Sequence, residues 1–177
     1  FDPTRALQIQ PSTSSSDILN MLELYESRTN YLKVIKDLKL YLDIKDLGND
    51  ETIDIHVTTN NDNLGKEDLK FSFSENSYSL LNKDLNVLQT AKYGENIITN
   101  DLNITVKSAS LINDRPIDIK FTNPEKMYKA FKKRMDVKAI VGRNSFFRND
   151  GLITVSYVTD DINLGKEIIN YANSSFL

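Results

Sequence analysis

The side chains that could act as a general base or a nucleophile are scarce in this chain. His56 is the sole imidazole in the 177 residues, and cysteine is absent. A Ser–His–Asp triad would have to use His56, and no G-x-S-x-G sequence presents a serine beside it. Because His56 lies mid-way along an alternating segment, on its polar side, we interpret it as an exposed structural residue and predict that the protein is not an enzyme.

The glycine-containing turns do not match metal or phosphate sites. Zinc sites are built mainly from Cys and His, which are too few here. The segment 60–65 places Leu64 where a calcium loop needs an oxygen ligand. Gly65-Lys66 is followed by Glu67, where a phosphate-binding loop needs Ser or Thr to reach Mg²⁺. We therefore expect no metal and no cofactor.

Two acidic runs have simple structural interpretations. Residues 49–51 read Asn-Asp-Glu and are typical of a solvated turn that binds an ion weakly at most. Asp160-Asp161 could serve a glycosidase as paired carboxylates. Their position just before a predicted helix instead indicates a cap and a first-turn charge that the helix dipole favours.

Basic residues gather in one stretch that contains few acids: Lys126, Lys129, Lys132, Lys133, Arg134, Lys138, Arg143 and Arg148. On the predicted helix, Lys126, Lys129 and Lys133 share the face opposite Met127 and Phe131. This face is either solvated or contacts an anionic partner, such as an acidic glycan, a lipid head group or a neighbouring subunit. These three lysines are the candidate contact residues for a partner or polymer.

The overall charge argues against general binding of nucleic acids and leaves room only for a local basic patch. The chain has 22 Lys and Arg against 25 Asp and Glu, a formal charge of −3. Nucleic-acid binding rests on neutralising phosphates with a surplus of cations. We therefore expect no nucleic-acid partner.

The hydrophobic period changes twice along the chain. Apolar residues recur at helical spacing from residue 18 to 42, in two helices separated near Ser27 or Thr29. An Asn123-Pro124 start signal predicts a helix to about 135, and Thr159 or Asp160 is expected to cap a last helix that runs to 177. Strands are predicted by alternation at 5–10, 53–58, 69–73, 78–80, 85–89, 102–106, 117–121, 137–141 and 152–158.

These segments predict an α+β fold. We expect a mixed sheet packed with helices from both ends of the chain, plus a β-rich meander or small barrel inserted at about 50–112. The length favours a single domain over 1–177. The pentapeptide Asn-Leu-Gly-Lys-Glu occurs at 63–67 and again at 163–167, but strand follows the first copy and helix the second, so we interpret the repeat as coincidence.

The two ends indicate a piece of a longer protein. The chain begins with Phe1 rather than Met, and the helical pattern is still running at Leu177. The longest apolar runs are only a few residues, so no segment is predicted to span a bilayer. We expect any membrane anchors to lie in flanking segments.

Four segments resemble, in order, those of the periplasmic region of bacterial polysaccharide chain-length determinants, the polysaccharide co-polymerases. The resemblance rests on a strand at 5–10, a helix pair around Ser27-Arg28 that continues to Leu40, a β-rich insertion from 64 to 94, and a strand and helix from 153 to 176. The last helix is similar to the family pattern "D-x-x-L-a-x-x-i-i-N" at Asp161, Leu164, Ile168, Ile169 and Asn170. Ile162 stands where Pro is usual, and Gly165 where Ala is usual.

The resemblance implies a non-catalytic periplasmic domain at the bacterial inner membrane that regulates the chain length and export of a surface polysaccharide, such as capsule, exopolysaccharide, O-antigen or lipopolysaccharide. The nearest likeness is to the capsule and exopolysaccharide subgroup that is often linked to a tyrosine kinase. It implies a homo-oligomeric ring in the intact protein, with the polymerase and export machinery and the polysaccharide as partners. The alternatives are a periplasmic glycan-binding or glycan-processing module, and an adaptor domain that binds only protein.

Overall fold

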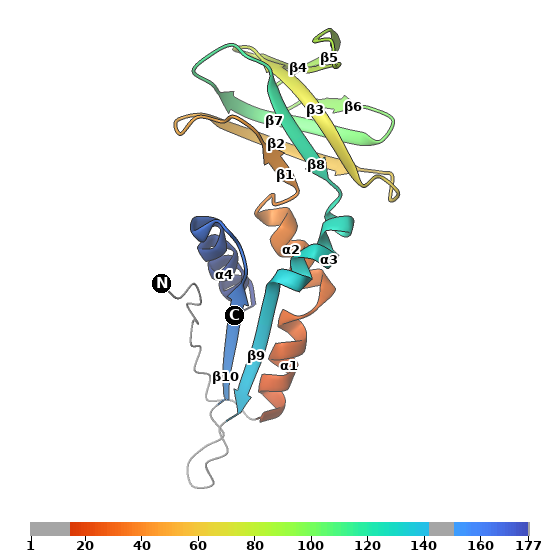
Figure 1. Ribbon diagram of the computed structural model, residues 1–177. Helices are drawn as coiled ribbons and strands as arrows, with labels where there is room; N and C mark the ends of the chain where they lie inside the picture. The colour runs from red at the N-terminus through yellow and green to blue at the C-terminus, as the bar shows by residue number, and fades with distance from the viewer. Residues whose placement is uncertain (1–14, 142–150, 177) are drawn as a thin grey trace. The chain divides into compact units, whose positions relative to one another are not determined.

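The fold is α+β, as the sequence predicts, in a computed structural model that describes residues 15–141 and 151–176 (Figure 1). The helices are α1 (Ser15–Tyr25), α2 (Arg28–Asp37), α3 (Pro124–Arg134) and α4 (Ile162–Phe176). The strands are β1 (Leu42–Ile44), β2 (Thr52–Thr59), β3 (Lys66–Phe73), β4 (Ser77–Leu81), β5 (Val87–Lys92), β6 (Asn96–Ile98), β7 (Leu102–Ser110), β8 (Ile117–Thr122), β9 (Met135–Val141) and β10 (Gly151–Tyr157). The strand predicted at 5–10 lies outside the described residues.

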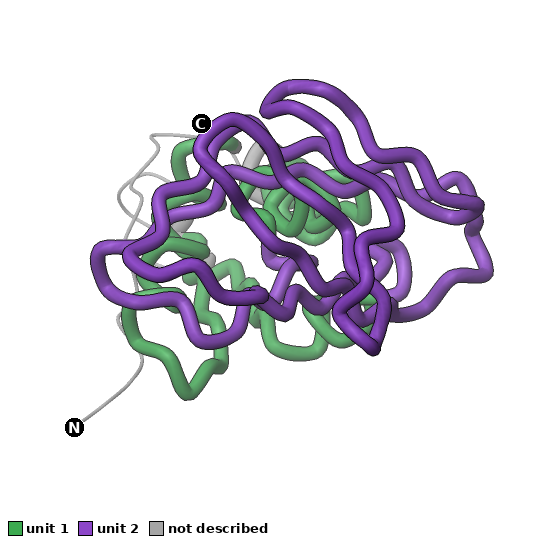
Figure 2. The backbone as a smooth tube through the Cα atoms, turned by 90° about the horizontal axis from the view of Figure 1, so that it is seen from above, with its two compact units in different colours: residues 1–39, 127–177 green, residues 40–126 purple. Residues whose placement is uncertain are grey.

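The chain forms two compact units, which Figure 2 distinguishes by colour. Unit 1 lies within residues 1–39 and 127–177, and unit 2 comprises residues 40–126. The β-rich insertion predicted at about 50–112 falls inside unit 2. Unit 2 is longer at both ends, because it also includes β1 and β8, which pair with each other. The prediction of one domain over 1–177 stays a prediction.

Unit 1 is built on the antiparallel hairpin of β9 and β10, which pairs Met135 with Tyr157 and Val141 with Gly151. Helix α1 contacts both strands and α4 contacts β10, so helices from both ends of the chain pack on this hairpin, as expected (Figure 1). Val155 and Ile168 are among the residues fully removed from solvent there. The sheet was expected to be mixed, but every strand pair within the described residues is antiparallel.

The junction between α1 and α2 is set by Ser27. Its side-chain oxygen accepts a hydrogen bond from the backbone N–H of Asn30 at 3.2 Å, which caps α2 as one of the two predicted candidates. The apolar stripe predicted this helix to continue to residue 42, which is wrong, because α2 ends at Asp37 and Lys39 adopts a positive φ of 50°. The following residues leave the helix to form β1.

Unit 2 consists of two antiparallel sheets, with strand orders β1-β8-β3-β4-β5 and β2-β7-β6. Strands such as β2, β4, β7 and β8 alternate buried with more exposed residues, as predicted for strands with one buried face, whereas β5 is exposed along most of its length. Tyr78 in β4 joins the two sheets, because its hydroxyl donates to the backbone carbonyl of Ile104 in β7 at 2.9 Å. The buried side chains of unit 2 include Ile55, Val57, Leu69, Phe71, Tyr78, Ile104, Val106, Ile117, Ile119 and Phe121.

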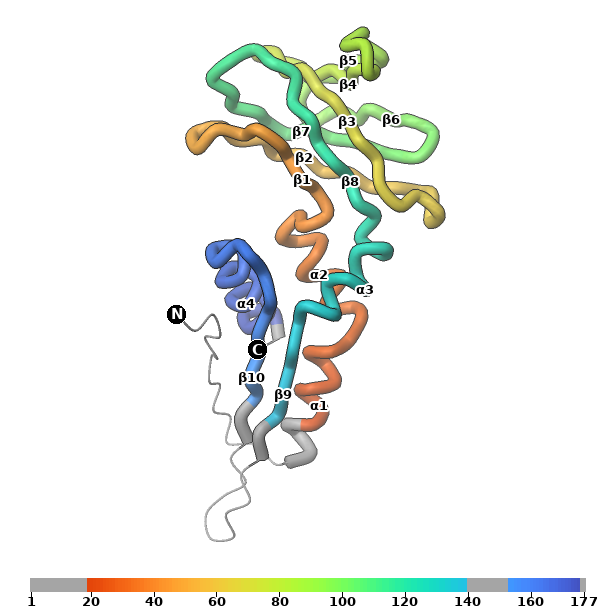
Figure 3. Tube along the Cα trace, in the orientation of Figure 1, coloured from red at the N-terminus to blue at the C-terminus, as the bar shows by residue number. Residues whose placement is uncertain are grey.

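The first and last strands of unit 2 lie side by side. Leu42 pairs with Phe121, and the backbone N–H of Thr122 donates to the carbonyl of Tyr41 at 2.9 Å. The rings of Tyr41 and Phe121 contact edge to face, with centroids 6.0 Å apart. Figure 3 follows the chain from α2 into β1 and from β8 into α3. Unit 2 is therefore inserted through two adjacent chain crossings, an arrangement that tolerates excision.

We expect a fragment of residues 40–126 to fold without the rest of the chain, because its sheets and buried side chains are internal to it. The measurement is a cooperative thermal transition followed by far-UV circular dichroism. A fragment cut at 50–112 is the control, and it should not fold, since it lacks β1 and β8. A 40–126 fragment that melts without cooperativity would contradict this expectation.

The glycine at position 165 has a steric explanation in the structure. A Cβ at this buried position in α4 would lie 2.8 Å from Cγ2 of Thr159. Thr159 cannot rotate freely, because its Oγ1 accepts the backbone N–H of Asp161 at 3.1 Å. Alanine is therefore compatible with the helical backbone at position 165, but its Cβ would clash with the methyl group of Thr159.

We predict that Gly165→Ala lowers the thermal midpoint, although alanine has the higher helix propensity. In a Thr159→Ser background the clashing methyl is gone and the hydroxyl remains. There the same change should stabilise the protein by about 0.5–1 kcal/mol. A double-mutant cycle of unfolding free energies measures this, and additive effects would contradict the steric account.

Candidate functional site

Helix α3 carries the candidate lysines, and Asn123 fixes where it begins. The Asn123 side chain is buried, and its Oδ1 accepts the backbone N–H of Glu125 at 3.0 Å. Its Nδ2 donates to the carbonyl of Leu64 at 3.0 Å, and its backbone N–H donates to the carbonyl of Gly65 at 2.9 Å. The polar cap before Pro124 was predicted, whereas its anchorage to the 64–65 turn was not.

The inner side of α3 is aromatic. The ring of Phe131 is buried, and its centroid lies 5.8 Å from Tyr31 in α2 and 5.2 Å from Tyr157 in β10. Tyr128 packs 6.0 Å from Tyr31, and the guanidinium of Arg28 lies 5.9 Å above the Tyr128 ring. Burial, followed by nearby acidic groups, raises the pKa of Tyr31 to about 12, so its hydroxyl stays neutral. These contacts fix the rotation of α3 about its axis.

This rotation leaves Lys126, Lys129 and Lys133 exposed, as the helical spacing predicts. Within residues 15–141 and 151–176, none of the three forms an ion pair. Lys132 and Arg134 are also exposed, and Glu125 is the sole acid of this helix. We call Lys126, Lys129 and Lys133 the basic face of α3. On the opposite side Phe131 is buried, but Met127 is only half-buried.

Lys138, the described member of the basic stretch that lies beyond α3, has an acidic partner of its own. Lys138 pairs with Asp136, with 2.6 Å between Nζ and Oδ2. Arg143 and Arg148 lie outside the described residues. The candidate surface is thus confined to α3 in the part of the chain that the structure describes.

The remaining candidate residues take structural positions. His56 is exposed on β2, and its Nδ1 lies 3.3 Å from the hydroxyl of Tyr41. Asp161, rather than Thr159 or Asp160, caps α4, because its Oδ1 accepts the backbone N–H groups of Asn163 and Leu164 at 2.9 and 3.1 Å. No group of three or more acidic or histidine side chains that could hold a metal ion occurs among the described residues.

Sequence reasoning missed the ion pair between Glu51 and Arg115. Glu51 was expected in a solvated turn, yet it is 5% exposed. Its Oε1 accepts from Nη1 of Arg115 at 2.8 Å and from the backbone N–H of Ile112 at 2.9 Å. Its Oε2 accepts from Nη2 of Arg115 and from the backbone N–H of Gly48 at 2.7 Å. Both oxygens are therefore occupied, as in strong bidentate pairs.

The Glu51–Arg115 pair holds two connections together. Arg115 also donates to the carbonyl of Asp46 at 2.6 Å, so one guanidinium and one carboxylate join the β1–β2 and β7–β8 loops. The side-chain hydrogen bonds from Arg115, then those from the backbone, lower the pKa of Glu51 from the usual 4.5 to about 2. No pattern in the sequence links residues 51 and 115, which are far apart in the chain.

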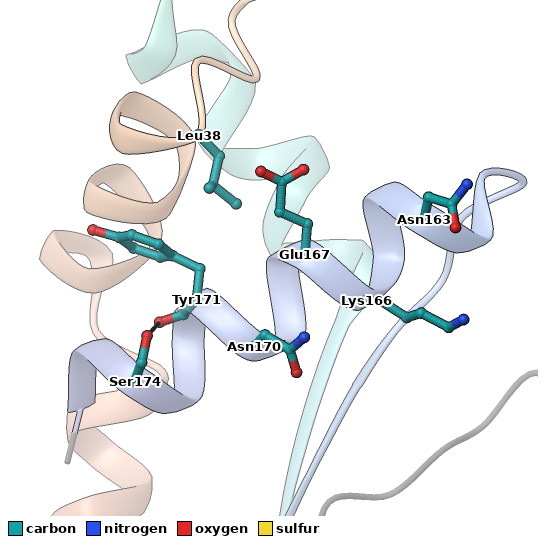
Figure 4. A pocket seen from close by; sticks show the side chains of 7 residues that line it. All are labelled: Leu38, Asn163, Lys166, Glu167, Asn170, Tyr171 and Ser174. Carbon is teal, nitrogen blue, oxygen red and sulfur yellow. Dashed lines mark hydrogen bonds between the residues drawn. The ribbon is translucent and has the colours of Figure 1, made fainter.

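A shallow groove of about 640 Å³ lies between α2 and α4 in unit 1 (Figure 4). In Figure 4, Glu167 and Tyr171 point toward α2, whereas Lys166 points away. The Tyr171 hydroxyl donates to Asp37 and accepts from Lys33 Nζ at 3.3 Å, so these groups satisfy one another. The groove is lined by Leu38, Asn163, Lys166, Glu167, Asn170, Tyr171 and Ser174.

No family model matches the chain, and no curated protein matches it. Among solved structures, FlgL of Xanthomonas campestris is similar at 14% identity over 76% of this chain, with a TM-score of 0.30. This chain spans 41% of the length of that protein. A TM-score this low supports no inference about fold or function. Within the described residues no helix is long and apolar enough to cross a membrane.

We predict that the Glu51–Arg115 pair makes stability depend on pH in acid. Because the pKa of Glu51 is lower in the folded than in the unfolded state, its stabilisation is complete above about pH 4.5 and is lost as the pH falls toward 2. The difference in unfolding free energy between the wild type and Glu51→Gln should therefore shrink over this range. Urea unfolding from pH 7 to 2.5 measures it, and a difference that stays constant would refute the assignment.

Proposed function

We propose that this chain is a non-catalytic periplasmic domain of a polysaccharide co-polymerase, and that the basic face of α3 contacts an acidic partner during control of chain length. The partner is either an acidic surface of a neighbouring subunit in a homo-oligomeric ring or the growing polysaccharide. Flanking segments would hold the domain at the bacterial inner membrane, beside the polymerase and export machinery.

The observation that supports this proposal most directly is that Lys126, Lys129 and Lys133 are exposed and form no ion pair with another described residue. This chain has more acids than bases, 25 against 22. Here the cations of α3 outnumber its single acid, while the chain as a whole is acidic. A separated positive surface attracts an anionic partner and orients it before contact.

The rigid support of this face also favours a contact role. Asn123 fixes the start of α3, and Phe131 with Tyr128 fixes its rotation. The lysines are thus presented from a helix whose orientation is set by packing. Binding of a partner therefore carries no entropy cost for ordering the backbone beneath them. The resemblance at Ser27-Arg28 and 161–170 supplies the class of partner, namely a glycan or a second subunit.

Charge reversal tests the proposal. Replacing Lys126, Lys129 and Lys133 by Glu should leave the thermal midpoint of this chain almost unchanged, because exposed substitutions alter stability by only about ±0.5 kcal/mol. In the full-length protein the same variant should shift the polysaccharide length distribution, since like charges then face the acidic partner. The readout is the glycan ladder from a strain complemented with each variant.

A matched control separates this local effect from a change in net charge. Lys45, Lys66 and Lys107 are exposed lysines of unit 2 that form no ion pair with described residues. Their triple Glu variant changes the formal charge by the same amount and should leave the ladder unaltered. His56→Ala should also leave it unaltered, because no catalytic step is assigned to that imidazole. An unchanged ladder from the α3 variant, at normal protein level, would reduce the basic face to a solvated surface.

A further inference from the structure

The hairpin of β4 and β5 displays apolar side chains in solvent. Leu85, Val87 and Leu88 are 51%, 59% and 63% exposed, and they lie within four consecutive residues. Five of the six residues of β5 are exposed. Exposed apolar residues scattered singly are ordinary, but a cluster on a strand indicates a contact surface.

The turn that leads into β5 is held in a strained conformation. Leu85 adopts a positive φ of 65°, which is rare for a bulky side chain. Asn82 maintains it, because its Oδ1 accepts the backbone N–H groups of Asp84 and Asn86, both at 2.9 Å. The carbonyl of Asn82 accepts the N–H of Leu85 at 3.1 Å. These bonds hold the exposed Leu85 side chain in one position at the tip of the hairpin.

The edge of β5 that faces away from β4 has no strand partner among the described residues. The backbone N–H of Tyr93 donates to the carbonyl of Asn76, so antiparallel alternation gives Ala91 and Gln89 the bonds to β4. Thr90 then directs its N–H and carbonyl to the free edge. Its hydroxyl lies 2.7 Å from that of Ser79 across the pair, which fits the closer spacing of a non-bonded pair.

We propose that β5 pairs antiparallel with β5 of a second copy of this chain, extending the five-stranded sheet across a two-fold axis. This inference goes beyond the proposed function and does not depend on it. Residues 87–91 carry no charge, so self-pairing sets no like charges opposite one another. A parallel arrangement would instead oppose Lys92 to Lys92, which is unfavourable.

The charges at the two ends of β5 select the second copy as the occupant. Lys83 and Asp84 lie in the turn before the strand, and Lys92 and Glu95 lie at its other end. All four are exposed. An antiparallel two-fold pairing brings the turn of one copy to the far end of the other, and each of these ends carries one cation and one anion that can pair across the interface. Such self-complementarity is what an isologous interface requires.

The contact is small. One edge strand and one turn cover less than a standard interface of about 1,600 Å². We therefore expect a weak dimer that is observed at high protein concentration, and in the intact protein a contact separate from any ring interface. Sedimentation equilibrium of this chain, into the hundreds of micromolar, measures the dimer dissociation constant.

Thr90→Pro and Leu88→Lys test the pairing of the β5 edge, and each has a control variant. Thr90→Pro removes the free N–H at a position where an edge strand tolerates proline, and it should abolish dimers without unfolding the protein. Thr90→Val keeps the N–H and should still dimerise. Leu88→Lys should weaken the dimer roughly tenfold or more, because it places a charge within the pairing. Val158→Lys, at an apolar residue 71% exposed in unit 1, is the matched control and should leave it unchanged.

The outcomes divide clearly. Concentration-dependent dimers that are lost in Thr90→Pro and Leu88→Lys but kept in Thr90→Val and Val158→Lys support the proposal, provided circular dichroism shows that all variants are folded. A monomer at every concentration would overturn it, and so would a dimer that none of the β5 variants affects. Because no polysaccharide or membrane enters the measurement, its failure is distinct from failure of the chain-length proposal.

Discussion

The ion pair between Glu51 and Arg115 is the interaction on which the arrangement of unit 2 most depends. The chain makes its first crossing from the five-stranded to the three-stranded sheet between β1 and β2, and its last crossing back between β7 and β8. Glu51 and Arg115 lie in these two connections and bind each other in bidentate geometry, with backbone N–H groups from both loops on the same carboxylate. Removing Arg115 would leave the buried carboxylate of Glu51 without its charged partner.

The connection that contains Glu51 follows β1, and the connection that contains Arg115 precedes β8. β1 and β8 pair with each other, so the two ends of unit 2 are neighbours. At the far side of the same sheet β5 is left as an edge strand, uncharged along most of its length. Natural edge strands are commonly protected by charge or proline, and the exposure of β5 follows from its place in this strand order.

Helix α3 shows how polar and apolar contacts together present a surface. Its first turn is fixed by the buried Asn123, and its inner side packs on Tyr31 and Tyr157. The lysines are exposed because the aromatic residues occupy the other side, so their position follows from packing rather than from any attraction among the lysines. The helical spacing alone was enough to predict this face, and it did not require knowledge of what Phe131 contacts.

The sequence by itself determined the features that depend on local spacing: the α+β class, the start of α3 and the exposed lysines. It narrowed the cap of α2 to Ser27 or Thr29, and the structure decided for Ser27. The sequence did not determine the short strands β1 and β6 or the Glu51–Arg115 pair, because each depends on residues distant in the chain. The pentapeptide at 63–67 and 163–167 shows the reason. Asn61 and Asp161 cap the two copies in the same way, each accepting the N–H of the residue two positions on at 2.9 Å. The first copy nevertheless enters β3, because Asn123 holds the carbonyls of Leu64 and Gly65 that a helix would need for its own bonds, whereas the second is free to form α4.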